Sequence, residues 1–224
     1  MLTIPPGQKI NVEEFKQLLL SQKHTTHRFR LPLTFPQAID ALNAAYIAEV
    51  EYRQRKYIPD CDTVAHIQHA ARWLTEPCPK FGMLLCGQCG NGKSTLVRAI
   101  RSLVQLLYSA SSYDDQRYLR IVDAKEVVAT AKADYRQFTD LCKTDMLAID
   151  DLGIEPSEVL DYGNVLNPAI DLLTRRYNDQ LFTLVTTNLT PQQIREHYGD
   201  RIADRFNEMM SRIVFNNPSY RNAQ

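Results

Sequence analysis

The sequence predicts an α/β domain in which helices cover both faces of a parallel β-sheet. Short apolar segments of strand length alternate with segments whose apolar residues recur at helical spacing. One apolar segment, Met83–Cys86, runs directly into the glycine-rich sequence GQCGNGKST at residues 87–95. A helical pattern follows, and its apolar face consists of Leu96, Ile100, Leu103 and Leu107. A strand, a glycine-rich loop and a helix in this order predict a phosphate-binding loop at the edge of the sheet.

The segment from Gly87 to Ser94 fits the P-loop pattern G-x-x-x-x-G-K-[ST] at every fixed position. Glycines allow this backbone to curl, so that successive N–H groups face phosphate oxygens at a helix N-terminus. We expect Lys93 to reach the β- and γ-phosphates of ATP and the Ser94 hydroxyl to bind Mg²⁺. The predicted nucleotide-binding residues of the loop are Gly87, Gln88, Cys89, Gly90, Asn91, Gly92, Lys93, Ser94 and Thr95.

Composition indicates an ordinary globular chain of 224 residues, of which 44% are hydrophobic, enough for one α/β domain and a small appendage. Basic and acidic residues number 26 each, so a nucleic-acid surface would need local basic patches. The candidate patches are Ser21–Arg30, for which a solvated loop is the alternative, and Arg53–Lys56. No segment approaches the roughly 18 apolar residues of a membrane span, and the N-terminus does not resemble a signal peptide. We therefore expect a cytoplasmic protein.

The five cysteines are odd in number and irregularly spaced, which favours a reducing compartment over a disulfide framework. Cys86 and Cys89 form a C-x-x-C pair, a pattern that elsewhere indicates zinc or redox chemistry. No second ligand pair lies at suitable spacing, and metal binding would compete with the phosphate loop. We interpret these two cysteines as small loop-filling residues.

Residues 1–60 predict a small helical region. Asn11 is a good N-cap before a first amphipathic segment, and Thr34–Pro36 begins a second, longer helix that ends in the basic run Arg53–Lys56. Such a region is too small for a core of its own, so we expect it to dock on the main domain or on a partner protein. Residues 61–224 are predicted to form the nucleotide-binding domain.

Beyond residue 61, Thr63 is expected to cap a helix that ends before Pro77. The predicted strands are then Tyr118–Val122, Met146–Ile149 and Leu181–Thr187, and the predicted helices are Ala124–Asp134 and Gly163–Asn178. Because strands that alternate with helices form parallel sheets, ligands are expected at the carboxyl ends of these strands.

Polar side chains follow two of the predicted strands. The segment Met146–Ile149 ends in Asp150 and Asp151, the pattern of a Walker B element. We assign Asp150 to the Mg²⁺ shell and Asp151 to the attacking water, with Glu155 as a substitute for Asp151 and a solvated turn as the alternative. Asn188 follows the last strand and would polarise the water or contact the γ-phosphate, although it also fits a turn or an N-cap.

Four motifs in this order resemble those of the AAA+ ATPases of the DnaC-like bacterial helicase-loader family and its IstB-like transposition-helper relatives. The motifs are the P-loop, AIDDLGIEP, TTNLT, and GDRIADRF followed by PSYR, and the resemblance covers about residues 60–224. It implies a sensor 1 role for Asn188, an arginine finger at Arg205 with Arg201 as the alternative, and a sensor 2-like role for Arg221. The chain after Asn188 is too short for a full helical lid, so a truncated lid is expected.

The resemblance further implies a cytoplasmic ATPase that forms ATP-dependent homo-oligomers and acts on single-stranded DNA or on a hexameric replicative helicase. Three alternatives remain open at this point. One is an IstB-like ATPase that assists a transposase on duplex DNA, and another is a P-loop small-molecule kinase, against which the Asp150–Asp151 pair and the TTN sequence argue. The third is a nucleotide-gated binding module with negligible turnover.

Overall fold

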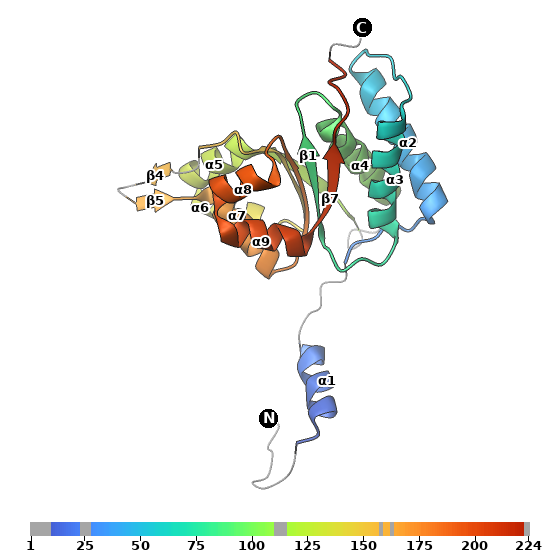
Figure 1. The fold of residues 1–224 in the computed structure, drawn as a ribbon. Coiled ribbons are helices and arrows are strands. Elements are labelled where there is room, and N and C mark those ends of the chain that lie inside the picture. The colour runs from blue at the N-terminus through green and yellow to red at the C-terminus, as the bar shows by residue number, and fades with distance from the viewer. Residues whose placement is uncertain (1–9, 23–27, 110–115, 157–158, 162–163, 222–224) are drawn as a thin grey trace.

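A five-stranded parallel sheet forms the centre of the chain (Figure 1), which confirms the predicted fold class. Its strands lie in the order β2-β3-β6-β1-β7. They are β1 (Gly82–Gly87), β2 (Leu119–Asp123), β3 (Met146–Leu152), β6 (Phe182–Thr187) and β7 (Met210–Phe215). The structure is a computed structural model that describes residues 10–22, 28–109, 116–156, 159–161 and 164–221.

The register of the sheet brings the polar strand ends to one edge. β1 lies between β6 and β7, and Cys86 near its end is opposite Thr187 of β6. β3 pairs with β6 on the other side of that strand, where Ile149 is opposite Val185. The P-loop, the carboxylates that follow Ile149 and Asn188 therefore leave the sheet at the same edge, as expected for parallel strands.

Two layers of helices cover the sheet because side chains of each strand alternate between its faces. Met83 and Leu85 of β1 pack in one apolar cluster, and Leu84 and Cys86 pack in the other. Helices α2 (Phe35–Tyr52), α3 (Cys61–Thr75) and α4 (Lys93–Tyr108) cover the first face. Helices α5 (Ala124–Ala133), α6 (Tyr135–Lys143), α7 (Pro168–Asn178), α8 (Pro191–Tyr198) and α9 (Asp200–Met209) cover the second.

The two N-terminal helices differ in their packing. Helix α1 (Val12–Gln22) stands apart from the sheet in Figure 1, with Val12 78% exposed and Leu19 48% exposed. Helix α2 instead buries Leu42 and Tyr46 in the same cluster as β1, against α3 and α4. The division into domains at residue 60 remains a prediction.

Within the described residues, no helix combines the length and the hydropathy that crossing a membrane requires.

Three local expectations are corrected. The helix expected from residue 163 begins at Pro168, because a short hairpin of β4 (Val159–Asp161) and β5 (Asn164–Leu166) precedes it. Helix α6 was not predicted. It begins where the Asp134 carboxylate accepts backbone N–H groups immediately after α5.

The start of α3 also differs from the prediction. Asp60, not Thr63, is the N-cap, because its side chain accepts the Thr63 N–H at 2.8 Å. Thr63 lies within the first turn, and its hydroxyl donates to the other carboxylate oxygen of Asp60 at 2.8 Å. Both residue types are good N-caps, so the sequence alone leaves the choice open.

Candidate nucleotide-binding site

The loop between β1 and α4 has the backbone that its glycines permit. Gly90 has φ +81° and Gly92 has φ +100°, conformations that other residues rarely adopt. A Cβ atom at Gly90 would lie 2.3 Å from Ser219 Oγ, and one at Gly92 would lie 2.4 Å from the Tyr46 hydroxyl oxygen. Neither position can therefore carry a side chain. The loop leads directly into α4, whose N-terminus favours bound anions.

The ammonium group of Lys93 lies within the loop and connects it to β6. Its Nζ donates to the carbonyl oxygens of Gly87 (2.8 Å) and Gln88 (2.7 Å) and to Asn188 Oδ1 (2.9 Å). The residue is only 4% exposed, and burial lowers the pKa of its side chain. Lys93 and Asn188, predicted separately from two motifs, thus contact each other.

Ser94 and Asp150 form the second pair of predicted residues that the fold brings together. Ser94 Oγ donates to Asp150 Oδ1 at 2.7 Å, and Arg98 Nη2 lies 3.6 Å from Asp150 Oδ2. A hydroxyl oxygen and a carboxylate oxygen are hard ligands, the type that Mg²⁺ prefers, and here they are adjacent. The residues present therefore fit a Mg²⁺ ion that accompanies a nucleotide.

Asp151 follows the metal candidate in an uncommon backbone conformation. Its φ is +57°, and its N–H donates to Thr186 Oγ1 at 2.8 Å. Burial, followed by the negative charge of Asp150, raises the pKa of the Asp151 carboxyl above its usual value, while the positive charge of Lys93 opposes this shift. A carboxylate with a raised pKa beside a phosphate loop is a reasonable candidate for a general base.

Comparison with known proteins gives matches in structure but not in sequence. No family model and no curated protein matches the chain. A DnaC helicase loader superposes with a TM-score of 0.57 at 18% identity, over 71% of this chain and 93% of that chain. DnaI gives a TM-score of 0.54 at 22% identity, over 71% of this chain and 88% of that chain.

A third neighbour is the replication initiator DnaA bound to AMPPCP and single-stranded DNA. It has a TM-score of 0.52 at 12% identity, over 72% of this chain and 49% of that chain. The chain shares the α/β fold of these three proteins. At these identities the likeness is one of fold, and it confirms the predicted resemblance to helicase loaders at that level.

The C-terminal segment of the chain crosses the P-loop. The Tyr220 N–H donates to Gly90 O at 2.9 Å, and Asn217 Nδ2 donates to Asn91 O at 3.1 Å. The Arg221 side chain passes close to Gly90, and its positive charge opposes the rise in the pKa of Asp151 that burial causes. The predicted sensor 2-like residue therefore lies beside the loop, and its role remains a prediction.

Sequence reasoning missed Asn217 and Tyr220. The Tyr220 hydroxyl donates to Asp60 Oδ2 at 2.9 Å and lies 2.8 Å from Thr63 Oγ1, which joins the C-terminal segment to the start of α3. Tyr220 belongs to the PSYR sequence, but only the arginine of that sequence carried an assigned role. Nothing in the spacing of Asn217 marks it as a neighbour of a loop more than a hundred residues earlier.

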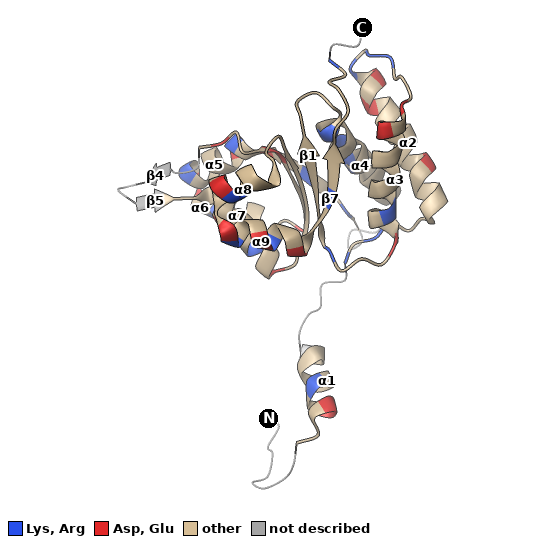
Figure 2. Cartoon of the chain, in the orientation of Figure 1, with Lys and Arg blue, Asp and Glu red and all other residues tan. Residues whose placement is uncertain are grey.

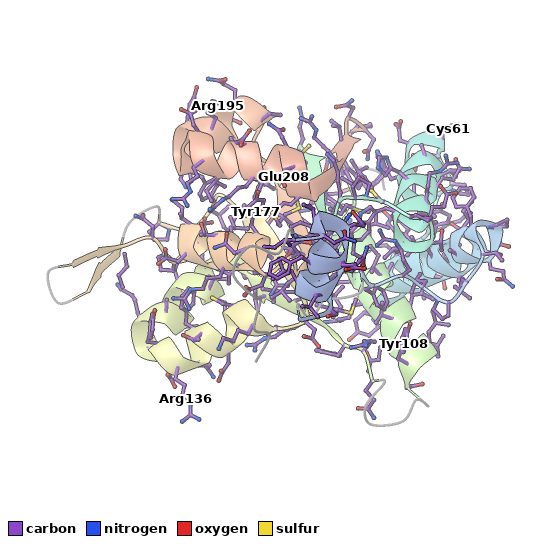
Figure 3. All side chains as sticks on the ribbon, turned by 90° about the horizontal axis from the view of Figure 1, so that it is seen from below. Cys61, Tyr108, Arg136, Tyr177, Arg195 and Glu208 are labelled. Carbon is purple, nitrogen blue, oxygen red and sulfur yellow. The ribbon has the colours of Figure 1, made fainter. Side chains whose placement is uncertain are left out.

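The two arginine-finger candidates differ in exposure. Arg205 is 8% exposed; its Nη1 donates to Thr174 Oγ1 at 2.6 Å, and its guanidinium carbon lies 4.9 Å from the centre of the Tyr177 ring. Figure 3 shows the labelled Tyr177 and Glu208 side by side, where the Tyr177 hydroxyl donates to the Glu208 carboxylate. Arg205 thus packs α9 on α7, whereas Arg201 is exposed.

Glu155, considered as a substitute for Asp151, has other partners. It is 4% exposed and accepts the Gly153 N–H at 2.8 Å and the Tyr198 hydroxyl. These contacts join the turn after β3 to the end of α8. A carboxylate held in this way has a structural role, so Asp151 is the better candidate for the water.

The two cysteines of the C-x-x-C pair have different surroundings, one in strand β1 and the other in the P-loop. Cys86 is buried and its Sγ lies 3.6 Å from Ile213 O, whereas Cys89 is exposed and lies 3.8 Å from Asn188 Nδ2. Among the residues that the structure describes, no group of three or more His, Cys, Asp or Glu side chains could hold a metal ion.

The basic segments contribute unequally to the surface. Acidic and basic residues are interspersed over the helices in Figure 2. Arg28 and Arg30 donate to backbone carbonyl groups just beyond α3, so their guanidinium groups are partly engaged within the fold. Residues 23–27 of the first candidate patch lie outside the described residues, whereas Arg53–Lys56 is exposed throughout.

Proposed function

We propose that this chain binds ATP with Mg²⁺ and hydrolyses it as an AAA+ ATPase. The observation that supports the proposal best is the pair of contacts that join the P-loop to neighbouring strands, Lys93 with Asn188 and Ser94 with Asp150. Three segments that separate sequence motifs identify, the P-loop, the end of β3 and the end of β6, thus meet at the carboxyl edge of the sheet. Titration of the purified chain with ATP, with and without Mg²⁺, tests the binding step directly.

Each residue has a role that follows from its chemistry. Lys93 and the loop N–H groups bind the phosphates, and Ser94 with Asp150 holds the metal, which neutralises charge that develops on the phosphate oxygens. Asp151 orients the attacking water and accepts its proton. Asn188 contacts Lys93 and is positioned to contact the same phosphate or the water. Arg221 adds positive charge from the C-terminal segment.

We expect Asp151→Asn to bind ATP as wild type does and to lose turnover by about 10²–10⁴-fold, the usual contribution of a general base. Asparagine preserves the shape of the side chain and tolerates the left-handed backbone at this residue, so the loss should reflect chemistry. Asp145→Asn, at the opposite and exposed end of the same strand, is the control. Phosphate release and nucleotide titration measure the two properties; equal turnover in both variants would exclude Asp151 as the base.

We further propose that the chain acts in DNA replication, on single-stranded DNA and on a hexameric helicase. The support is the likeness to the DnaC helicase loader, to DnaI and to a DnaA bound to single-stranded DNA. The exposed apolar residues Val12 and Leu19 of α1 make region 1–60 the proposed contact for the helicase. Capture of a replicative helicase by the full chain, and its loss in Leu19→Asp, tests that contact.

We expect salt-sensitive binding of single-stranded DNA that strengthens with ATP. Replacing Arg53 and Arg55 by Gln should reduce the steepness of log affinity against log salt by about 1.4 units, because each of the two lost phosphate contacts contributes about 0.7. The exposed Lys125 and Lys132 on α5, replaced by Gln, provide a charge-matched control. Fluorescence anisotropy over a salt series measures the slope. Absence of binding at low salt with ATP present would remove DNA from the proposal.

A further inference from the structure

One buried hydroxyl connects the carboxylate of Asp150 to the backbone of Asp151. Thr186 of β6 is 0% exposed, and its Oγ1 donates to Asp150 Oδ1 at 2.6 Å. The same oxygen accepts the Asp151 N–H at 2.8 Å. A threonine hydroxyl has one proton to donate and lone pairs to accept, so both bonds can exist together. The metal candidate and the base candidate are therefore tied to a single atom of the neighbouring strand.

The regular pairing of β3 with β6 is interrupted at this point. Ile149 is opposite Val185 and Leu152 is opposite Thr187, so Asp150 and Asp151 together face Thr186. Two residues opposite one define a β-bulge, a feature that redirects side chains and is common beside active sites. The bulge here includes the left-handed backbone of Asp151, an unfavourable conformation that its surroundings must maintain.

The Thr186 hydroxyl takes the place of a backbone partner within the bulge. It satisfies the Asp151 N–H, which would otherwise be a partly buried donor without a protein acceptor. It also holds Asp150 Oδ1, the oxygen that receives the Ser94 hydroxyl, in a fixed position. Removing it would therefore release both the carboxylate that faces Ser94 and the backbone that orients Asp151.

We propose that Thr186 is a positioning residue for ATP hydrolysis, which directs Asp150 toward the metal and fixes the bulge that presents Asp151. The inference rests on the proposed function of the same site. It goes beyond that function, because none of the sequence motifs assigned a role to this threonine. A threonine that only stabilises the fold would contribute to the free energy of unfolding and leave metal binding and turnover unchanged, so the two roles have different consequences.

The experiment compares substitutions that keep or remove the hydroxyl. Thr186→Val preserves the shape and removes both hydrogen bonds, Thr186→Ser keeps the hydroxyl, and Thr186→Cys offers a weaker donor of similar size. Thr183→Val is the matched control, since Thr183 is also 0% exposed on β6 and its hydroxyl accepts from Arg176 Nε at 2.9 Å, far along the strand from the carboxylates. The measurements are turnover, the Mg²⁺ concentration at half-maximal turnover, Mn²⁺ affinity with ATP present, and the free energy of unfolding.

We expect Thr186→Val to lower Mn²⁺ affinity and turnover by about 10- to 100-fold each, as for other residues that orient metal ligands. Thr186→Ser should restore most of both, Thr186→Cys should be intermediate, and Thr183→Val should lose stability alone. If Thr186→Val does not fold, the Cys variant gives the same comparison.

Two results would overturn the inference. One is a Thr186→Val variant that loses only stability, as the Thr183 control does. The other is failure of Thr186→Ser to recover Mn²⁺ affinity, which would show that side-chain shape matters and the hydroxyl does not. The proposed function fails separately, when wild type neither binds ATP with Mn²⁺ nor hydrolyses it. Mn²⁺ affinity is measured without turnover. It therefore tests whether Thr186 positions Asp150 even if the wild-type protein binds ATP and does not hydrolyse it.

Discussion

Lys93→Ala is expected to weaken ATP binding by about 10- to 150-fold, because a hydrogen bond to a charged group contributes about 1.5–3 kcal/mol. The Lys93 ammonium lies among the carbonyl groups of Gly87 and Gln88, at the strand end from which the phosphate loop begins. Turnover should fall below detection, since the same charge would also stabilise the γ-phosphate in the transition state.

Lys80 offers a matched control for this substitution. Its Nζ also donates to two backbone carbonyl groups, those of Asn207 (2.9 Å) and Met210 (2.8 Å), at the end of α9. Lys80→Ala should therefore lose comparable structural bonds and keep its ATP affinity. Isothermal titration calorimetry of both variants with ATP and Mg²⁺ measures the difference. Equal affinity in Lys93→Ala and wild type would show that the P-loop is not the nucleotide site.

Residues that act through one continuous segment could be predicted from the sequence. The P-loop residues are adjacent in the chain, and their strand and helix flank them directly, so the motif alone locates them. Asp150 and Asn188 could also be placed at one edge, because each directly follows an apolar strand segment and parallel strands end at the same edge of a sheet. The contacts of Lys93 with Asn188 and of Ser94 with Asp150 are consequences of that rule.

Contacts that depend on distant segments could not be predicted in this way. In the sequence, Thr186 looks like an ordinary strand residue. Only the bulge opposite it makes its hydroxyl a partner of the Asp150 carboxylate and of the Asp151 N–H. Asn217 and Tyr220 reach the P-loop because β7 lies beside β1, a strand order that apolar periodicity does not reveal. Helix α6 is short, and its start at Asp134 could equally be read as the end of α5.

The finger candidates illustrate the same limit within one helix. Arg201 and Arg205 are one turn apart, and both are interleaved with acidic residues, so the local pattern does not separate them. The packing of α9 does, because Ile202, Phe206 and Met209 face the core and Arg205 lies on the buried side with Thr174 of α7. An arginine that is 8% exposed and holds two helices together cannot reach a second subunit without disturbing that packing.

Arg201 is therefore the residue that we propose as the arginine finger, although the family resemblance alone favoured Arg205. A guanidinium from a neighbouring subunit would face the γ-phosphate from the side that Lys93 leaves open, where transition-state charge develops. In P-loop enzymes such a finger contributes about 10³–10⁵ in rate. Arg205→Ala should instead lower the free energy of unfolding, because it removes the contacts with Thr174 and the Tyr177 ring.

We expect Arg201→Ala to keep the ATP affinity of wild type and to lose at least about 10³-fold in turnover. The decisive measurement mixes Arg201→Ala with Lys93→Ala, each inactive alone. If Arg201 acts on a neighbouring subunit, some interfaces of the mixed assemblies pair an intact P-loop with an intact finger, and activity partly returns. Mixing Arg205→Ala with Lys93→Ala is the parallel test, and recovery there but not with Arg201→Ala would restore Arg205 as the finger. If mixed oligomers form and neither mixture recovers activity, neither arginine acts in trans. An intact P-loop in one subunit would then not be completed by an intact arginine in its neighbour.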